Sequence, residues 1–164
     1  MSKTVKIARR ETCRACDGSL ETLLDFGEHL IVSFGDKPQE KAPLVLTKCA
    51  SCNLVQLRDT VDPEFLFRHY YYKSGVNSTM RDHLRGIVED VTKRVTLERG
   101  DVVVDIGAND GTLLSFYGDQ LGLVGFEPAM DAPDDPNIWQ WRKDFFSAKA
   151  YEPIANKAKV ITCV

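Results

Sequence analysis

Two matching cysteine pairs, Cys13-Arg-Ala-Cys16 and Cys49-Ala-Ser-Cys52, carry the strongest chemical signal in this chain of 164 residues. Zinc prefers four ligands in a tetrahedron, and two C-x-x-C turns supply four thiolates as two preformed halves. Each turn must bend tightly after its second cysteine, and Gly18 and Asn53 are residue types that tolerate a left-handed backbone. We therefore predict a structural zinc site with all four ligand positions occupied by cysteine.

The fifth cysteine, Cys163, lies in an apolar segment and is predicted to be a small core residue rather than a ligand. Paired C-x-x-C units in a reducing compartment favour a metal site over disulfides. A redox role is disfavoured because neither pair follows a strand at the start of a helix.

A second candidate site is the segment VVVDIGANDG, in which a buried strand ends at Asp105 and runs into a glycine turn. The dinucleotide fingerprint requires G-x-G-x-x-G, whereas Gly107 and Gly111 here form G-x-x-x-G. Asn109 replaces the middle glycine that lets a pyrophosphate approach, and Asp110 adds negative charge beside it. These features favour S-adenosylmethionine, which carries a sulfonium and an ammonium group but no phosphate. Gly107, Asn109, Asp110 and Gly111 of the turn are predicted to bind it.

Acidic residues also follow the next strands, where a parallel sheet collects its ligand-binding groups. Glu127 comes 22 residues after Asp105, close to the spacing of a β-α-β unit, and its two oxygens are predicted to accept both ribose hydroxyls. Asp144 and Phe145 are predicted to bind the adenine amino group and to stack on the ring. Either Asp105 or Asp110 is predicted to meet the positively charged methionine portion.

The cysteine pairs lie within residues 1–60, where short apolar stretches alternate with turn residues. The stretches are Leu20–Phe26, Ile31–Phe34 and Pro43–Thr47, and 35–43 reads as a polar loop. We predict a small β-rich, zinc-binding module for this region.

Residues 61–99 carry helix signals and are predicted to be a helical connecting segment. Asp62-Pro63-Glu64 supplies an N-cap, a proline at the first helical position and an acid near the positive helix end, so a short helix to about Tyr70 is expected. A second helix is expected to start with Ser78 as cap and to end at Gly100. Its apolar stripe has helical period: Met80, Leu84, Ile87, Val88, Val91 and Val95.

From residue 100 to 164, apolar strands alternate with helix signals, which indicates a parallel sheet with right-handed crossovers. The expected strands are Val102–Ile106, Leu121–Phe126, a third closed by 144–146, and Lys159–Val164; the expected helices begin at Thr112–Tyr117 and cover Tyr151–Ala158. The fold class is therefore α/β, with a β-rich zinc module ahead of the sheet.

Composition and charge narrow the class of protein further. The chain is 43% hydrophobic and 27% charged, as in soluble globular proteins, and its net charge of −3 gives no general attraction to nucleic acid or anionic lipid. The basic N-terminus has no apolar stretch behind it, and no apolar run approaches membrane-spanning length. We predict a cytoplasmic protein without a membrane partner.

In these motifs and their order the chain resembles the sugar C-methyltransferases that act on nucleotide-linked deoxysugars. That family combines a four-cysteine zinc module, a helical segment with a tyrosine-rich stretch, and a class I, Rossmann-like methyltransferase core. The residues that carry the likeness are Cys13–Cys16, Leu24–Gly27, Cys49–Leu57, Tyr70–Ser74, Met80–His83, Asp105–Leu114 and Gly125–Ala129.

The resemblance implies S-adenosylmethionine as cofactor, structural zinc, and methylation of a keto-deoxysugar nucleotide through an enolate. It places Pro128 beside the cofactor after Glu127, and it makes Tyr72 the candidate hydrogen-bond donor or base within this chain. Family members are longer, with a Glu-His pair beyond the fourth strand. We therefore expect a truncated methyltransferase core without its catalytic base, whose exposed sheet edge offers a surface for association.

Two alternatives remain at this point. A zinc-ribbon module that binds nucleic acid or protein without catalysis would use the basic cluster near the first cysteine pair, namely Lys3, Lys6, Arg9, Arg10 and Arg14. An NAD-dependent enzyme is disfavoured by Asn109 and Asp110.

Overall fold

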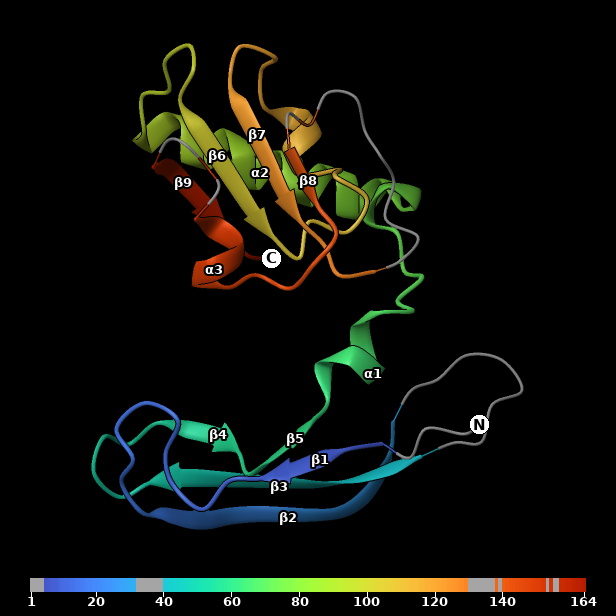
Figure 1. Ribbon diagram of the computed structural model, residues 1–164, viewed down its shortest axis with the longest axis vertical. Helices are drawn as coiled ribbons and strands as arrows, with labels where there is room; N and C mark the ends of the chain where they lie inside the picture. The colour runs from blue at the N-terminus through green and yellow to red at the C-terminus, as the bar shows by residue number, and fades with distance from the viewer. Residues whose placement is uncertain (1–4, 32–39, 130–137, 139, 153, 155–156) are drawn as a thin grey trace. The chain divides into compact units, whose positions relative to one another are not determined.

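The computed structural model describes residues 5–31, 40–129, 138, 140–152, 154 and 157–164. The chain divides into two compact units, Met1–Leu66 and Phe67–Val164, which are described one at a time (Figure 1). Most of the predicted polar loop at 35–43 lies outside the described residues, as does the greater part of the apolar stretch Ile31–Phe34.

The first unit is built from antiparallel strands, which confirms the predicted β-rich module around the cysteines. Its elements are β1 (Ile7–Arg9), β2 (Leu20–Leu30), β3 (Lys41–Cys49), β4 (Val55–Leu57) and β5 (Asp59–Val61). One sheet has the order β2-β3-β4, and β1 pairs with β5. Because β3 begins at Lys41, the last residues of the predicted loop belong to a strand.

Helix α1 (Pro63–Phe67) begins as the sequence predicts but ends three residues early. Asp62 Oδ1 accepts from the Glu64 N–H at 3.0 Å, so the predicted cap is confirmed. A short 3₁₀ turn, η1 (Ser74–Val76), follows after the tyrosine stretch.

Helix α2 (Ser78–Arg94) is capped by Asn77, whose side chain accepts from the Thr79 and Met80 N–H groups, and not by Ser78. The helix ends at Arg94 because Val95 adopts an extended backbone and packs with Leu97 against the core. The prediction that Gly100 ends this helix is therefore wrong.

The second unit contains a four-stranded parallel sheet, which confirms the α/β class. Its strands are β6 (Val102–Ile106), β7 (Gly122–Phe126), β8 (Gln140–Arg142) and β9 (Ala158–Thr162), in the order β8-β7-β6-β9. After β8 the chain returns to the other side of β6. The strand order therefore reverses between β6 and β9, and open α/β sheets bind ligands at the carboxyl ends beside such a point.

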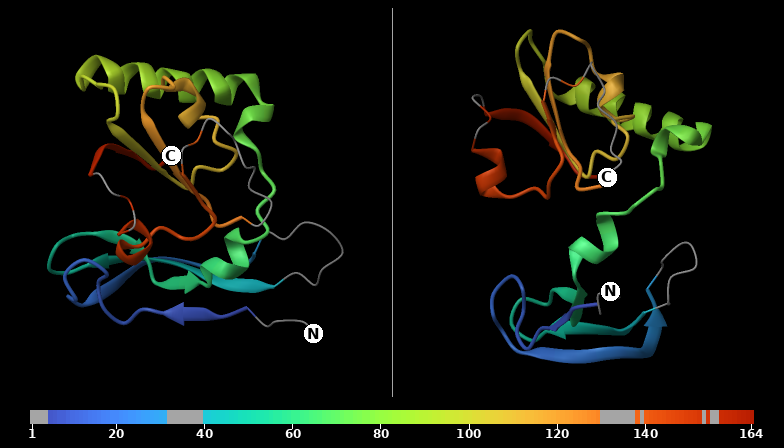
Figure 2. Two further views of the ribbon diagram at one scale, coloured as in Figure 1. Left: turned by 45° about the horizontal axis from the view of Figure 1, so that its top comes forward. Right: turned by 45° about the vertical axis from the view of Figure 1, so that its right-hand side comes forward.

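Both faces of this sheet are covered (Figure 2). The predicted stripe of α2 packs on one face, where Leu84 and Val88 are buried against Val103. The opposite face buries Val102 and Val104 against Ile154 and the side of α3 (Ala148–Tyr151). The helix that the sequence treats as part of a connection thus belongs to the same compact unit as the sheet.

Further local predictions in this unit are wrong. The third strand, β8, ends at Arg142, so residues 144–146 do not close it. The helix expected from Thr112 is only a 3₁₀ turn, η2 (Leu114–Phe116), because the chain turns there to bury consecutive leucines in the core. Helix α3 starts earlier than expected, on a Ser147 cap, and ends at Tyr151 with Glu152 as its C-cap. Cys163 is exposed after β9 rather than buried, because Thr162 takes the inward position.

No helix among the described residues is long and apolar enough to cross a bilayer.

Candidate metal centre and cofactor site

The two cysteine pairs form equivalent knuckle turns. The Asp17 N–H donates to the Cys13 carbonyl and the Asn53 N–H donates to the Cys49 carbonyl, each at 3.0 Å. Asp17 and Asn53 both have a left-handed backbone, with φ of 56° and 61°. The prediction for Asn53 is confirmed, but in the first turn the left-handed residue is Asp17 and not Gly18.

Gly18 is required for a different reason, which is space. A Cβ atom at this position would lie 2.6 Å from Ser51 Oγ and 3.0 Å from Cys49 Sγ. The glycine therefore lets the backbone of the first knuckle pass close to the second.

The four sulfurs are arranged as one metal site. Cys13 Sγ lies 3.7 Å from Cys52 Sγ, Cys16 Sγ lies 3.5 Å from Cys49 Sγ, and all four lie within 4.8 Å of one another. Zinc–sulfur bonds of about 2.3 Å in a tetrahedron put sulfurs about 3.8 Å apart. The geometry therefore fits a closed zinc centre.

The pKa values of the cysteine thiols also favour a zinc centre. The Ala15 N–H donates to Cys13 Sγ at 3.4 Å and is the main cause that lowers the pKa of Cys13 to about 6. At Cys16 the Gly18 N–H acts to lower the pKa, but neighbouring thiols such as Cys52 outweigh it and raise the pKa to about 12. Four sulfurs this close cannot all be thiolates without a cation between them, and Zn²⁺ removes that conflict.

Arg14 in the first knuckle binds strand β4. Gln56 Oε1 accepts from the Arg14 main-chain N–H at 3.2 Å and from its Nε at 2.9 Å, and the Leu57 carbonyl accepts from Nη2 at 2.8 Å. This member of the basic cluster therefore has a structural role in the module, while Lys3 lies outside the described residues.

The second site is the turn that follows β6. Gly107, Asn109 and Gly111 all have left-handed backbones, with φ of 74°, 54° and 78°. The N–H groups of Gly107 and Ala108 donate to the Phe126 carbonyl at 2.8 and 3.0 Å, and the Gly111 N–H donates to the Ala108 carbonyl at 2.8 Å. The turn thus uses these donors internally, unlike a turn that presents a row of N–H groups to phosphate.

Two buried carboxylates lie at the ends of adjacent strands. Asp105 is 4% exposed and accepts from Thr162 Oγ1 at 2.7 Å; Glu127 is 5% exposed and accepts from the Asn109 and Ala129 N–H groups, each at 2.8 Å. Burial, with a smaller contribution from the charge of Glu127, raises the pKa of Asp105 to about 6. The site is therefore acidic and largely shielded from water.

The side chains of Asn109 and Asp110 bind the segment 72–75 of the same unit. Asn109 Nδ2 donates to the Tyr72 carbonyl at 2.7 Å, and Asn109 Oδ1 accepts from the Ser74 N–H at 3.0 Å. Asp110 Oδ2 accepts from the Gly75 N–H at 2.8 Å. The tyrosine stretch is thus attached to the turn after β6.

Arg68 gathers the remaining predicted residues. Its guanidinium donates to the Pro128 carbonyl at 3.2 Å and to the Lys143 carbonyl at 3.4 Å, pairs with Asp144 Oδ1 at 3.1 Å, and lies 5.0 Å from the Phe145 ring centroid. The structure therefore brings Pro128, Asp144 and Phe145 together around one cation that sequence reasoning missed.

Tyr72 is 43% exposed, and its ring centroid lies 6.4 Å from that of Tyr70. Its main chain, rather than its ring, makes the bond to the turn.

Sequence reasoning missed two residues of the site, Thr162 and Arg68, because neither belongs to a motif. Their partners Asp105 and Asp144 are 57 and 76 residues away along the chain.

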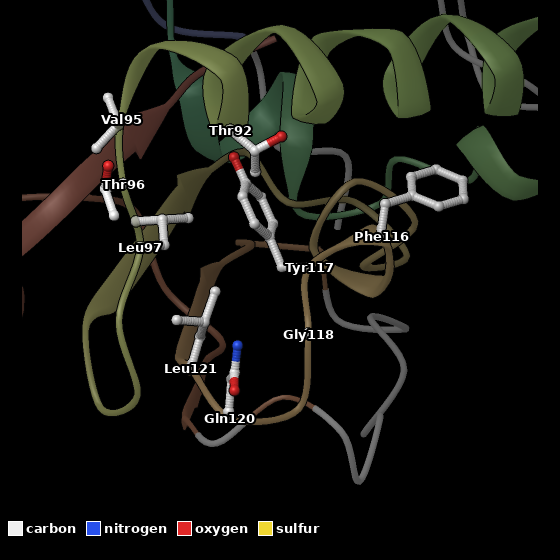
Figure 3. Close-up of a pocket in the computed structure, with 9 residues that line it drawn as sticks. All are labelled: Thr92, Val95, Thr96, Leu97, Phe116, Tyr117, Gly118, Gln120 and Leu121. Atoms are coloured by element: carbon white, nitrogen blue, oxygen red, sulfur yellow. The ribbon is translucent and has the colours of Figure 1, made fainter.

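A cavity of about 370 Å³ lies elsewhere, beside the residues that precede β6 and β7 (Figure 3). It is lined by Thr92, Val95, Thr96, Leu97, Phe116, Tyr117, Gly118, Gln120 and Leu121. Among the described residues, none hydrogen-bonds the buried Tyr117 hydroxyl, and burial raises its pKa. The cavity is at the amino ends of the strands, away from the carboxyl ends that carry the acids.

Comparison with known proteins agrees with this description. Residues 13–67 match a family described as a putative zinc binding domain. The chain is also similar to the C-methyltransferase NovU of Streptomyces niveus, with 31% identity over 135 residues; the match covers 73% of this chain and 30% of that relative. The chain therefore spans less than a third of the relative's length.

Fold and cysteine geometry define a protein with a zinc-binding module and a parallel α/β unit. The two matches carry the assignment further and confirm the resemblance predicted from the motifs: the chain is similar to the N-terminal portion of the zinc-containing sugar C-methyltransferases. They support an enzyme family and do not favour a zinc ribbon that binds nucleic acid or protein without catalysis.

Proposed function

We propose that the second unit is the S-adenosylmethionine-binding part of a class I, Rossmann-like core. The order β8-β7-β6-β9, with the first strand between the second and the last, supports this reading because such sheets bind ligands at their carboxyl ends. The predicted residues Asp105, Glu127 and Asp144 all lie at or just after those ends.

The observation that carries the proposal is the pair of buried acids beside a turn whose own N–H groups are already used. Asp105 would repel a pyrophosphate, and the donors of Gly107 and Ala108 bind Phe126 instead of an anion. A ligand with positive charge, hydroxyl groups and no phosphate suits this environment. That combination favours S-adenosylmethionine over NAD.

Each carboxylate has capacity left for a ligand. Both Glu127 oxygens accept one N–H each, and a carboxylate oxygen can accept a second donor such as a ribose hydroxyl. Asp105 would face the cationic methionine portion, with the backbone of 107–111 around it. Asp144 and Phe145 would serve the adenine, together with Pro128.

The reaction proposed for the whole enzyme is C-methylation next to a ketone on a nucleotide-linked deoxysugar. S-adenosylmethionine supplies an electrophilic methyl group. The protein must remove the α-proton, align the attacking carbon and stabilise the enolate oxygen with a hydrogen-bond donor. Within this chain Tyr72 is the candidate for that donor or for the base, since the residue is exposed. The zinc centre has no open position and is assigned a structural role.

Calorimetry with S-adenosylhomocysteine tests cofactor binding directly. The chain should bind the ligand saturably, and Glu127→Ala should weaken binding roughly tenfold or more, because a buried charge-assisted hydrogen bond contributes about 1.5–3 kcal/mol. Glu89→Ala, at an exposed position of α2, is the matched control and should leave the affinity unchanged. Absence of heat at millimolar ligand with the wild-type chain would refute cofactor binding.

A further inference from the structure

We propose that Asn109 and Asp110 are positioning residues, whose side chains set the main chain of Tyr72–Gly75 instead of contacting cofactor. This inference rests on the proposed function, because it assigns these residues a task in presenting Tyr72 beside the cofactor turn. It also changes the roles expected for them from sequence, which were contacts to the cofactor itself.

Asn109 joins two main-chain groups with one side chain. Its amide offers a donor and an acceptor side by side, and these bind the Tyr72 carbonyl and the Ser74 N–H, at 2.7 and 3.0 Å. An aspartate keeps the acceptor but lacks the donor, and a glycine has neither. Asparagine therefore matches the carbonyl of one residue and the N–H of the residue two positions later.

Asp110 continues this attachment at the next residue of the segment. Its Oδ1 is held by the Thr112 main-chain N–H at 3.1 Å and by Thr112 Oγ1 at 2.6 Å, which leaves Oδ2 directed at the Gly75 N–H at 2.8 Å. A Cβ at Gly75 would lie 2.7 Å from Thr112 Oγ1 and 3.0 Å from Asp110 Oδ2. Only a glycine allows the segment to approach the turn this closely.

The backbone of Asn109 links this attachment to the proposed cofactor site. Its left-handed conformation directs the main-chain N–H to Glu127 Oε2 at 2.8 Å while its side chain holds Tyr72 and Ser74. Asparagine suits this position because it tolerates the left-handed backbone better than most residues and its side chain can still bond to Tyr72 and Ser74. The position of Tyr72 therefore depends on the same turn that contacts Glu127.

Amide hydrogen exchange by NMR tests the assignment without cofactor. Asn109→Gly removes the side chain and keeps the left-handed backbone, and it should speed exchange of the Ser74 amide roughly tenfold or more. Asn109→Asp should restore protection of Ser74 but still shift the Tyr72 carbonyl ¹³C resonance, because the donor is missing. Asp119→Asn, at an exposed loop position, should change neither.

Unchanged Ser74 exchange in Asn109→Gly overturns the proposal, provided that the Val104 amide in the central strand stays protected and so reports an intact fold. Gly75→Ala is the second variant, which leaves the turn residues in place. It should speed amide hydrogen exchange in the segment Tyr72–Gly75, and unchanged slow exchange of these amides would also contradict the proposal.

Calorimetry with S-adenosylhomocysteine separates positioning from cofactor contact. Asn109→Gly should weaken binding less than about threefold, whereas Glu127→Ala weakens it roughly tenfold or more. Equal losses in both variants would make Asn109 a cofactor ligand and overturn the assignment. If the wild-type chain binds no ligand, the proposed function fails, whereas the exchange results still decide how the segment is held.

Discussion

Replacing Asp105 with asparagine removes a negative charge from the centre of the proposed site while keeping the shape of the side chain. The carboxylate is buried, and it accepts a short hydrogen bond from Thr162 Oγ1 at 2.7 Å. An asparagine carbonyl accepts the same bond. The substitution therefore isolates the cost of burying the charge.

The magnitude follows from the pKa of Asp105, which burial raises from 3.8 to about 6. Folding then favours the protonated acid, so stability is fully present below pH 3.8 and is lost as pH rises through about 6. A difference of about 2 units at 1.36 kcal/mol each amounts to about 3 kcal/mol at pH 7.5 and about half of that at pH 5. Asp105→Asn should therefore stabilise the second unit by about 3 kcal/mol at pH 7.5.

Urea denaturation followed by tryptophan fluorescence measures this effect, because both tryptophans, Trp139 and Trp141, are in the sequence of the second unit. The gain of the variant over wild type should shrink by about half between pH 7.5 and pH 5. A gain that is independent of pH would show that Asp105 is not the titrating group. A loss of stability at pH 7.5 would refute the reasoning, because it would mean that the charge is favourably solvated.

Three further predictions concern metal and glycine. The chain should carry one zinc per molecule by atomic absorption. Cys49→Ser, or removal of the metal by a chelator, should abolish the circular dichroism signal of the folded first unit, because structural zinc contributes its binding free energy to folding. A folded, metal-free preparation would refute the site. Gly18→Ala should weaken zinc retention against a chelator roughly tenfold, because the added methyl meets Ser51 Oγ at 2.6 Å, and unchanged retention would contradict that contact. Gly86→Ala, where nothing lies within 4 Å of a Cβ, should instead raise the stability of α2 by about 0.5–1 kcal/mol in urea denaturation.

Patterns that are local in the sequence predicted much of the fold. The apolar run of β6 is bounded by an acid and a glycine, and its side chains alternate between two buried clusters, as expected for an interior parallel strand. The apolar residues of α2 recur so regularly at helical period that the pattern predicts a helix and no strand. The cysteine spacing likewise specified the metal centre, because both knuckles are closed by bonds within five residues.

Contacts between distant segments explain what the sequence could not reveal. Thr162 reaches Asp105 only because β9 pairs with β6, and no pattern near either residue announces that bond. Arg68 reads as one more charge in a short helix, yet it meets Asp144 from 76 residues away. The choice between Asn77 and Ser78 as the cap of α2 depended on the backbone at position 77, because both residue types are good caps.

The glycine turn shows how one residue type can redirect a common motif. In a dinucleotide site the middle glycine exposes backbone to a pyrophosphate. Here Asn109 takes the left-handed conformation that a glycine would take, but its side chain binds Tyr72 and Ser74 of its own chain. Substituting glycine alone would not create a dinucleotide site, because the N–H groups of Gly107 and Ala108 would still donate to the Phe126 carbonyl. In the proposed cofactor site, discrimination against a pyrophosphate would therefore rest on the internally bonded turn and on Asp105, while the Asn109 side chain holds the tyrosine segment.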